Sequence, residues 1–292
     1  MEQLEGITYC HEHTTIDLSY IKLSEDTVLD CQKETIKEYH SLYKKGVRNI
    51  VDVTVAGMNR NPLYVKKVAE VTGIDIIQAT GFYIEEFLPP MVRNSSIEQL
   101  AEWMIKEIRV GIEDSGIKAR VIGEIGSSKN TFTENEQKVF EAAVIAQKET
   151  GVPIMTHAHL GTFGHEQVVF FKERNVELSK IVIGHADLSG CSDYVLHMLR
   201  EGVFVAFDTI GKESYLPDIE RAKMLSAIEA NGLIDRVLLS MDITRKSYME
   251  HKGGIGYSYL IDTFIPLMET YGIKRESIKR MLVDNPQEFF GL

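Results

Sequence analysis

Short apolar runs rich in isoleucine and valine recur along the chain, and longer segments with helical periodicity separate them. Near-continuous apolar runs of this kind are typical of parallel β-strands that are covered on both faces. The pattern predicts eight strands, over residues 7–13, 49–55, 75–81, 120–125, 153–159, 181–187, 203–209 and 236–243.

The segments between these runs carry helix signals. The apolar residues of 31–45 fall on one side of a helix. Thr133 and Glu136 have the spacing of a capping box, which predicts a helix that begins after Thr133. Asn285 followed by Pro286 is typical of an N-cap and first helical position, so we expect the last helix to begin there.

Eight alternations of strand and helix favour a closed parallel barrel, the (β/α)8 or TIM-barrel fold of the α/β class. A doubly wound open sheet is the alternative, but no glycine-rich phosphate-binding motif follows the first strand. The length of 292 residues suits one barrel, and no linker or low-complexity segment divides the chain. We therefore predict a single domain over residues 1–292.

Composition narrows the setting and the partners. The apolar fraction of 44% is ordinary for a globular protein. The formal net charge of −11 argues against nucleic acid or a membrane surface as a partner. It leaves a small-molecule substrate, including an anionic one held by a local cluster of lysine and arginine. The three cysteines are far apart, and no stretch is typical of a membrane span or a secretion signal, so we expect a cytoplasmic protein.

Residue types that bind metals stand at the ends of the predicted strands. In the sequence His-Glu-His, a strand would direct His11 and His13 to one face, although such a pair alone could equally lie on the surface. The carboxyl ends of barrel strands meet at one rim, where active sites form. This rim would collect His11, His13, Glu124, His157, His159, His185, Asp187, Asp208 and Asp242. A single aspartate there could cap a helix, but the whole set predicts a metal site.

Four histidines and two carboxylates suit two divalent ions about 3.5–4 Å apart, joined by a carboxylate and a hydroxide. Glu124 is placed to supply that bridge, and the hydroxide would be the nucleophile. Zn²⁺ is the expected metal for nitrogen and carboxylate ligands, with Mn²⁺, Co²⁺ or Fe²⁺ as alternatives. Spacing alone does not choose between His157 and His159 as the ligand.

The motifs HEH at 11–13, GEIG at 123–126, THAH at 156–159, GHADL at 184–188 and SMD at 240–242 resemble the phosphotriesterase family of the amidohydrolase superfamily. The resemblance runs from Gly6 through Phe290. It is greatest to the phosphotriesterase homology proteins, through FDTIGKESYLPD at 207–218 and LSMDITRKSY at 239–248. It implies a TIM-barrel hydrolase with two metal ions, and barrels of this family are often homodimers.

By this resemblance, His11, His13 and Asp242 would bind the more buried ion, and His157 and His185 the more exposed one. The family often bridges its ions with a carboxylated lysine on the fourth strand, where this chain has Glu124. Glutamate is shorter, a departure that bears on activity toward phosphotriesters. Asp242 would be the catalytic base that accepts the proton of the attacking water.

The loops after the seventh and eighth strands are the recurrent phosphate site of barrels. Lys212 and Tyr215 follow the seventh strand, and Arg245 and Tyr248 follow the eighth. The spacing of Arg245 and Tyr248 resembles the anion site of relatives that hydrolyse phosphorylated sugar lactones, with Lys212 or Ser214 at the position of their lysine. These residues are the predicted substrate site, and surface ion pairs are the alternative.

His159 and Asp187 have no single predicted role. His159 would face the substrate or orient a metal ligand, and Asp187 would orient a ligand or cap a helix. We predict hydrolysis of a small ester, a lactone (including a phosphorylated sugar lactone) or a phosphoester. The alternatives are an amidase or deaminase and, in another class, a non-catalytic metal-containing binding protein. The presence of both Glu124 and Asp242 argues against the last.

Overall fold

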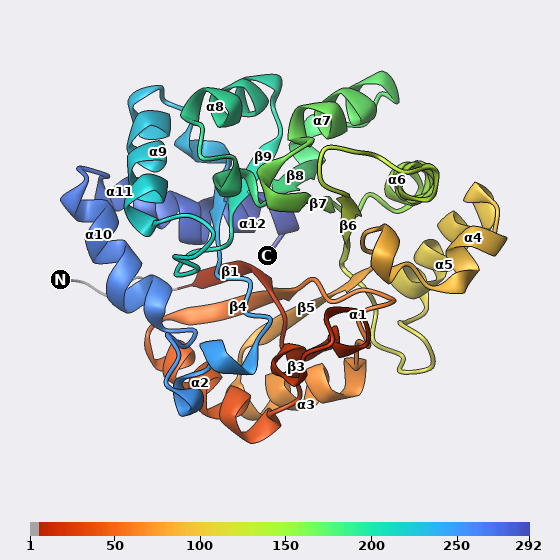
Figure 1. The fold of residues 1–292 in the computed structure, drawn as a ribbon, viewed down its shortest axis with the longest axis horizontal. Helices are drawn as coiled ribbons and strands as arrows, with labels where there is room; N and C mark the ends of the chain where they lie inside the picture. Colours follow the sequence, from red (N-terminus) through yellow and green to blue (C-terminus); the bar gives the residue numbers. More distant parts are fainter. Residues whose placement is uncertain (1–5) are drawn as a thin grey trace.

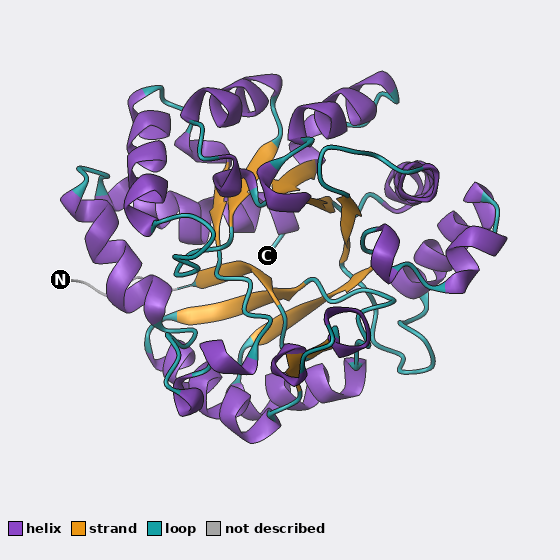
Figure 2. Ribbon diagram, in the orientation of Figure 1, coloured by secondary structure: helices purple, strands orange, loops and turns teal. Residues whose placement is uncertain are grey.

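Residues 6–292 are described by a computed structural model, and they contain an eight-stranded parallel barrel (Figure 2). The strands follow in the order β1 (Ile7–Glu12), β4 (Val47–Asp52), β5 (Asp75–Thr80), β6 (Val121–Ser127), β7 (Ile154–Ala158), β8 (Ile181–Gly184), β9 (Phe204–Phe207) and β10 (Val237–Leu239). The last strand returns to the first, where the Asp242 amide donates to the carbonyl oxygen of His11 over 3.2 Å. Each predicted apolar run overlaps one of these strands, although β4 begins two residues before its run and β6 ends two residues after its run, so the barrel prediction is confirmed.

Helices surround the strands, as Figure 1 shows. They are α2 (Gln32–Lys44), α3 (Pro62–Thr72), α4 (Pro90–Asn94), α5 (Ile97–Arg109), α6 (Glu134–Thr150), α7 (Gly164–Glu173), α8 (Ser192–Glu201), α9 (Asp218–Ala230), α10 (Ile265–Thr270), α11 (Arg275–Lys279) and α12 (Asn285–Phe290). The strands are mostly buried on both faces, which is why they read as apolar runs. None of the helices within residues 6–292 has the length and apolar character to cross a membrane.

Local signals set some helix ends but not all. The predicted capping box forms, with the Thr133 side chain accepting from the Glu136 amide and the Glu136 side chain accepting from the Thr133 amide. The last helix α12 does begin at Asn285, but the predicted N-cap role of Asn285 was wrong. A π-helical stretch over Arg280–Asp284 runs directly into α12, so Asn285 lies inside a continuing helix and caps nothing. Its side-chain amide instead donates to the carbonyl oxygens of Ile234 and Val237, both over 2.9 Å.

A small flap between β1 and α2 covers one side of the rim. It consists of β2 (Ile16–Asp17), α1 (Ser19–Lys22), the 3-10 turn Glu25–Thr27 and β3 (Val28–Leu29). Contacts at its two ends hold it in place. Lys22 donates to Glu86 over 2.8 Å, and Asp26 accepts from the Ser247 amide and hydroxyl, each over 2.7 Å. The sequence pattern did not predict this hairpin, because two-residue strands show no periodicity.

Candidate metal centre

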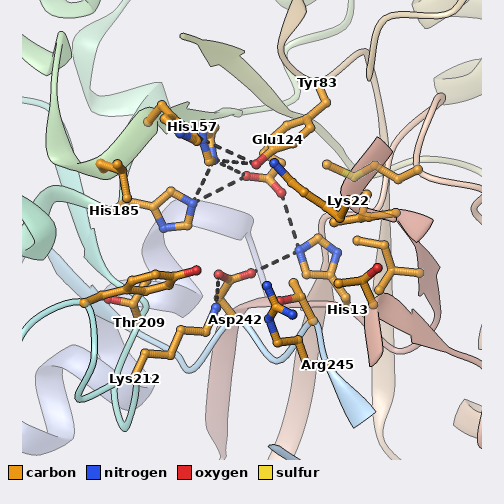
Figure 3. Close-up of a pocket in the computed structure, with 18 of the residues that line it drawn as sticks. His13, Lys22, Tyr83, Glu124, His157, His185, Thr209, Lys212, Asp242 and Arg245 are labelled. Carbon is orange, nitrogen blue, oxygen red and sulfur yellow. Dashed lines mark hydrogen bonds and ion pairs between the residues drawn. The ribbon is translucent and has the colours of Figure 1, made fainter. Parts of the chain in front are cut away.

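The carboxyl ends of five strands bring the six predicted metal ligands together. Figure 3 shows His13, Glu124, His157, His185 and Asp242 converging on one space. His11, the sixth, is fully buried beneath them and its ring lies 5.0 Å from that of His185. Two groups of ligand atoms lie close enough to hold an ion, His11 with His13 and Asp242, and His11 with Glu124 and His185.

One buried carboxylate orients two of the histidines. Asp208 lies directly after β9 and is fully buried. Its Oδ1 is 2.7 Å from Nδ1 of His185, and its Oδ2 is 3.0 Å from Nδ1 of His11. Both rings therefore turn Nε2 toward the centre, the arrangement in which metal-binding histidines are held by outer partners.

The other two histidines follow the same rule with different partners. Nδ1 of His13 lies 2.9 Å from the hydroxyl of Thr54, which leaves Nε2 facing the centre. His157 is turned the other way: its Nε2 lies 3.0 Å from Nδ1 of His159, and its Nδ1 faces Glu124. Each of the four rings thus has one nitrogen directed inward and one beside an outer partner, which is a hydrogen bond in three rings and the carboxylate of Asp208 at 3.0 Å in His11.

Glu124 lies between the two halves of the centre. Its Oε1 is 3.4 Å from Nε2 of His13, while its Oε2 is 3.0 Å from Nδ1 of His157 and 3.7 Å from Nε2 of His185. Each oxygen therefore faces a different group of histidines. This is the placement that a carboxylate bridging two cations requires.

The centre contains three buried carboxylates, whose negative charges favour the binding of cations. Glu124, Asp208 and Asp242 are buried carboxylates, and burial alone would raise the pKa of each. The neighbouring histidines outweigh burial for Glu124 and Asp208, as the Lys212 ammonium chiefly does for Asp242, and all three pKa values lie below the ordinary range. Three ionised groups so close together repel one another unless positive charge lies among them.

Burial and the neighbouring charges also shift the pKa values of the imidazoles. Burial alone would lower the pKa of His185, but the charge of Asp208 outweighs it and raises the pKa to about 10. Burial would likewise lower the pKa of His13, yet Asp242 and Glu124 raise it to about 9. His157 differs, because burial and the nearby His185 lower its pKa to about 4. Both ring nitrogens of His11 are buried without a hydrogen bond of good geometry to any residue of 6–292, and only Nδ1 has a carboxylate, that of Asp208, as close as 3.0 Å. The inward Nε2 together with the other donors fits divalent ions.

The backbone that carries Asp242 is clamped from behind. Glu12, between the two histidines of β1, points away from the centre and accepts hydrogen bonds from the Ser240 hydroxyl and the amides of Met241 and Ile243. Asp242 itself has φ of 51°, a left-handed conformation that side chains other than glycine rarely adopt. His185 has φ of 55°. Such strained positions persist only where the surroundings fix them, and they gather at functional sites.

A second buried network joins the loops after β8 and β9. The fully buried Arg221 of α9 donates to Asp187 over 2.6 Å, to the Thr209 hydroxyl over 2.7 Å and to Asp218 over 2.8 Å. Asp187 also accepts from Thr209. Asp187 therefore holds two loops together, and within residues 6–292 it makes no hydrogen bond or ion pair with an imidazole.

The predicted substrate residues surround the pocket above the centre. Lys212, Tyr215, His159 and Arg245 line it, whereas Tyr248 packs behind with its ring 5.9 Å from Nζ of Lys212. Arg245 has Asp26 3.6 Å away as its ion-pair partner, and its side chain is 35% exposed. Lys212 is only 3% exposed and donates to Oδ2 of Asp242.

Further residues of the site gave little sequence signal. The Tyr83 hydroxyl lies 3.3 Å from Nδ1 of His157, and Lys22 of the flap lines the pocket. Tyr83 comes from the loop after β5 and Lys22 from the short helix α1 of the flap, and the sequence reveals the path of neither segment. Thr54 follows β4 and Glu12 is the middle residue of His-Glu-His, so only their places beside strand ends could have indicated a role.

Comparison with known proteins shows where this barrel belongs. A sequence profile of the phosphotriesterase family matches residues 2–290. The chain belongs to the phosphotriesterase family. Among proteins of this family, the phosphotriesterase homology protein of Escherichia coli is 42% identical over 285 residues, which is 98% of each chain. Its crystal structure, with phosphate in the active site, matches 98% of both chains with a TM-score of 0.96.

Other relatives differ in the bond they cleave. A lactonase from Listeria monocytogenes is 27% identical with a TM-score of 0.93, covering 98% of this chain and 94% of its own. The N-acetyltaurine hydrolase of Xenopus tropicalis is 31% identical over 278 residues, 91% of this chain and 79% of its own. Phosphotriesterase family members are metal-dependent hydrolases, so the predictions of the family and of a hydrolase are confirmed.

Proposed function

We propose that this protein is a binuclear metal-dependent hydrolase of a small ester or lactone that carries an anionic group, such as a phosphorylated sugar lactone. The observation that carries the proposal is the orientation of the four histidines. In each ring one nitrogen lies beside a partner outside the centre, and the other nitrogen faces the centre. An outer partner that orients the ring in this way is typical of metal-binding histidines and is unnecessary for a pair of histidines on the surface.

His11, His13 and Asp242 would hold one ion, His157 and His185 the other, and Glu124 would bridge them. Two divalent ions, of which zinc is the expected one, would supply Lewis acidity there, which would polarise the substrate's carbonyl or phosphoryl oxygen and lower the pKa of the attacking water. Asp242 lines the pocket, its Oδ1 lies 3.2 Å from Nε2 of His13, and the Lys212 ammonium holds its pKa below the ordinary range, so its carboxylate can accept the proton of the attacking water.

Arg245 would bind the anionic group of the substrate. It lines the pocket, and its one carboxylate partner among the described residues is the distant and partly exposed Asp26. Such an exposed pair is weak, so a substrate phosphate can replace it at little cost. A bidentate contact to phosphate suits a guanidinium better than an ammonium.

Lactones, carboxyl esters, phosphate esters and amides, assayed with zinc-reconstituted protein, test the proposal. We expect turnover of lactones or esters that falls at least about 100-fold in Asp242→Asn, as for loss of a general base. The phosphorylated form of a sugar lactone should have a lower KM than the sugar lactone itself. Arg245→Met should remove that difference, whereas Lys246→Met, which loses an ion pair to Asp30 outside the pocket, should keep it.

Amide hydrolysis is the second candidate. It is favoured by the 31% identity to N-acetyltaurine hydrolases, whose substrate is an amide with a remote anionic group. The same activated water can attack a C–N bond. Faster turnover of N-acyl amino sulfonates than of any lactone or ester would select this reaction. Full turnover in Asp242→Asn would remove Asp242 from both mechanisms.

A further inference from the structure

Lys212 is a lysine in an unusual environment. It follows β9 and is 3% exposed, although lysine is almost never buried without a partner. Its Nζ donates to Oδ2 of Asp242, and no other carboxylate of residues 6–292 lies within ion-pair distance. Figure 3 shows the side chain of Lys212 reaching Asp242 at the edge of the centre.

Two aromatic rings flank the ammonium. Nζ of Lys212 lies 5.9 Å from the ring centre of Tyr215 and 5.9 Å from that of Tyr248. Both distances are within the range of a cation–π contact. The rings come from the two loops that follow β9 and β10. They limit the positions that the ammonium can occupy, and Asp242 is its anionic partner.

The two oxygens of Asp242 have separate partners. Oδ1 lies 3.2 Å from Nε2 of His13 and 3.7 Å from Nε2 of His11, whereas Oδ2 accepts from Lys212. The backbone of Asp242 is left-handed, and its side chain has no other hydrogen-bond donor from outside the centre among the described residues. Without Lys212, Oδ2 would lose its donor and the carboxylate would be held through Oδ1 alone.

We propose that Lys212 is a positioning residue that fixes Asp242 and that it does not bind the anion of the substrate. The proposal rests on the proposed function for its catalytic consequence, but not for its effect on the metal site. A substrate anion could take the ammonium only by leaving Oδ2 of the buried Asp242 carboxylate without its donor, which is unfavourable. Arg245, with a weak and exposed partner, meets no such obstacle.

The experiment compares Lys212→Met, Lys212→Gln and Lys212→Arg with a matched control. Lys223→Met removes a lysine whose ion pair with Glu220 lies on the exposed face of α9. Each variant is first checked for folding by circular dichroism. Lys212→Gln serves if Lys212→Met does not fold, because glutamine keeps a donor near Oδ2 without placing a charge there.

The first measurement needs no substrate. Zinc-loaded protein is mixed with excess chelator, and the release of zinc is followed over time. We expect release about 10-fold faster or more in Lys212→Met, the size of effect that loss of an outer partner of a metal ligand produces. Lys212→Arg should release zinc at close to the wild-type rate, and Lys223→Met should match wild type. Unchanged or slower release in Lys212→Met would overturn the proposal.

The second measurement separates positioning from substrate binding. With an uncharged lactone or ester, Lys212→Met should lower kcat by about 10-fold to 100-fold and change KM little. A rise in KM confined to phosphorylated substrates, with kcat and zinc release unchanged, would make Lys212 a ligand of the substrate anion and overturn the proposal. If the wild-type protein hydrolysed none of the compounds, the proposed function would fail, while the zinc measurement would still decide the role of Lys212.

Discussion

Asp208 holds two candidate metal ligands at once, and its replacement by asparagine tests that arrangement. Its two oxygens accept from Nδ1 of His185 over 2.7 Å and lie 3.0 Å from Nδ1 of His11. Asparagine keeps the shape but has one acceptor oxygen and one NH2 donor. Only one imidazole can then donate to it. The other imidazole must rotate or carry its proton on Nε2, where a metal ion would otherwise bind.

The size of the effect follows from this geometry. One ligand of the pair stays oriented, and one loses the partner that fixes its tautomer. Loss of such a partner typically costs 10-fold to 100-fold in metal affinity, or about 1.4 to 2.7 kcal/mol. We therefore expect Asp208→Asn to retain one ion and to bind the other about 10-fold to 100-fold more weakly.

Metal analysis after dialysis against a series of chelator concentrations measures both affinities. Asp193→Asn is the matched control, because Asp193 is an exposed aspartate in the first turn of α8. Thermal unfolding of the metal-free proteins shows whether Asp208→Asn keeps the fold. A folded Asp208→Asn that binds two ions as tightly as wild type would refute the reasoning.

Three other predictions concern the metal centre and the buried network beside it. Zinc affinity should rise between about pH 7 and pH 9, because His13 and His185, with pKa values of about 9 and about 10, must release their protons before zinc binds. Calorimetry in buffers of different ionisation enthalpy counts these protons, and a value near zero would contradict the prediction. Arg221→Met should lower the free energy of unfolding by about 3–5 kcal/mol, because it leaves buried carboxylates unpaired. Lys223→Met on the same helix should change it by less than about 0.5 kcal/mol in urea unfolding. His159→Ala should lower the affinity for one zinc ion by about 10-fold, because Nε2 of His157 loses its outer partner. His159→Asn should restore that affinity, because the amide oxygen can accept the same hydrogen bond. Equal zinc affinity in the two His159 variants would argue against that role.

The barrel could be predicted because its strands carry a dense signal. A parallel strand covered on both faces must be apolar at almost every position, and each of the eight runs satisfies this independently of its neighbours. The Asn-Pro pair at 285–286 shows where such reasoning fails. An N-cap asparagine and an asparagine inside a helix have the same sequence neighbours. In the structure the Asn285 side chain donates to the carbonyl oxygens of Ile234 and Val237, which are distant in the sequence, and this favours the position inside the helix over the N-cap.

The inner ligands and their outer partners differ in the same way. His11, His13 and Glu124 could be found because a barrel brings all strand ends to one rim, whatever the loops do. Thr54 and His159 orient their histidines only because particular loops place them within 3.0 Å of a ring nitrogen. A threonine after a strand is too common to indicate such a role, so Thr54 required the structure, whereas for His159 the sequence left an orienting role and a substrate-facing role as alternatives.

Lys212 and Arg245 make the same point for substrate binding. In the sequence they are equivalent, since each is a cation a few residues after a strand at the phosphate-binding end of a barrel. The structure separates them by their carboxylates. Lys212 bonds a buried aspartate that belongs to the metal centre, whereas Arg245 lies 3.6 Å from Asp26 of the flap, whose side chain is itself 33% exposed. Since an anion can replace a weak exposed partner far more easily than a buried one, the substrate's charge should be read by Arg245.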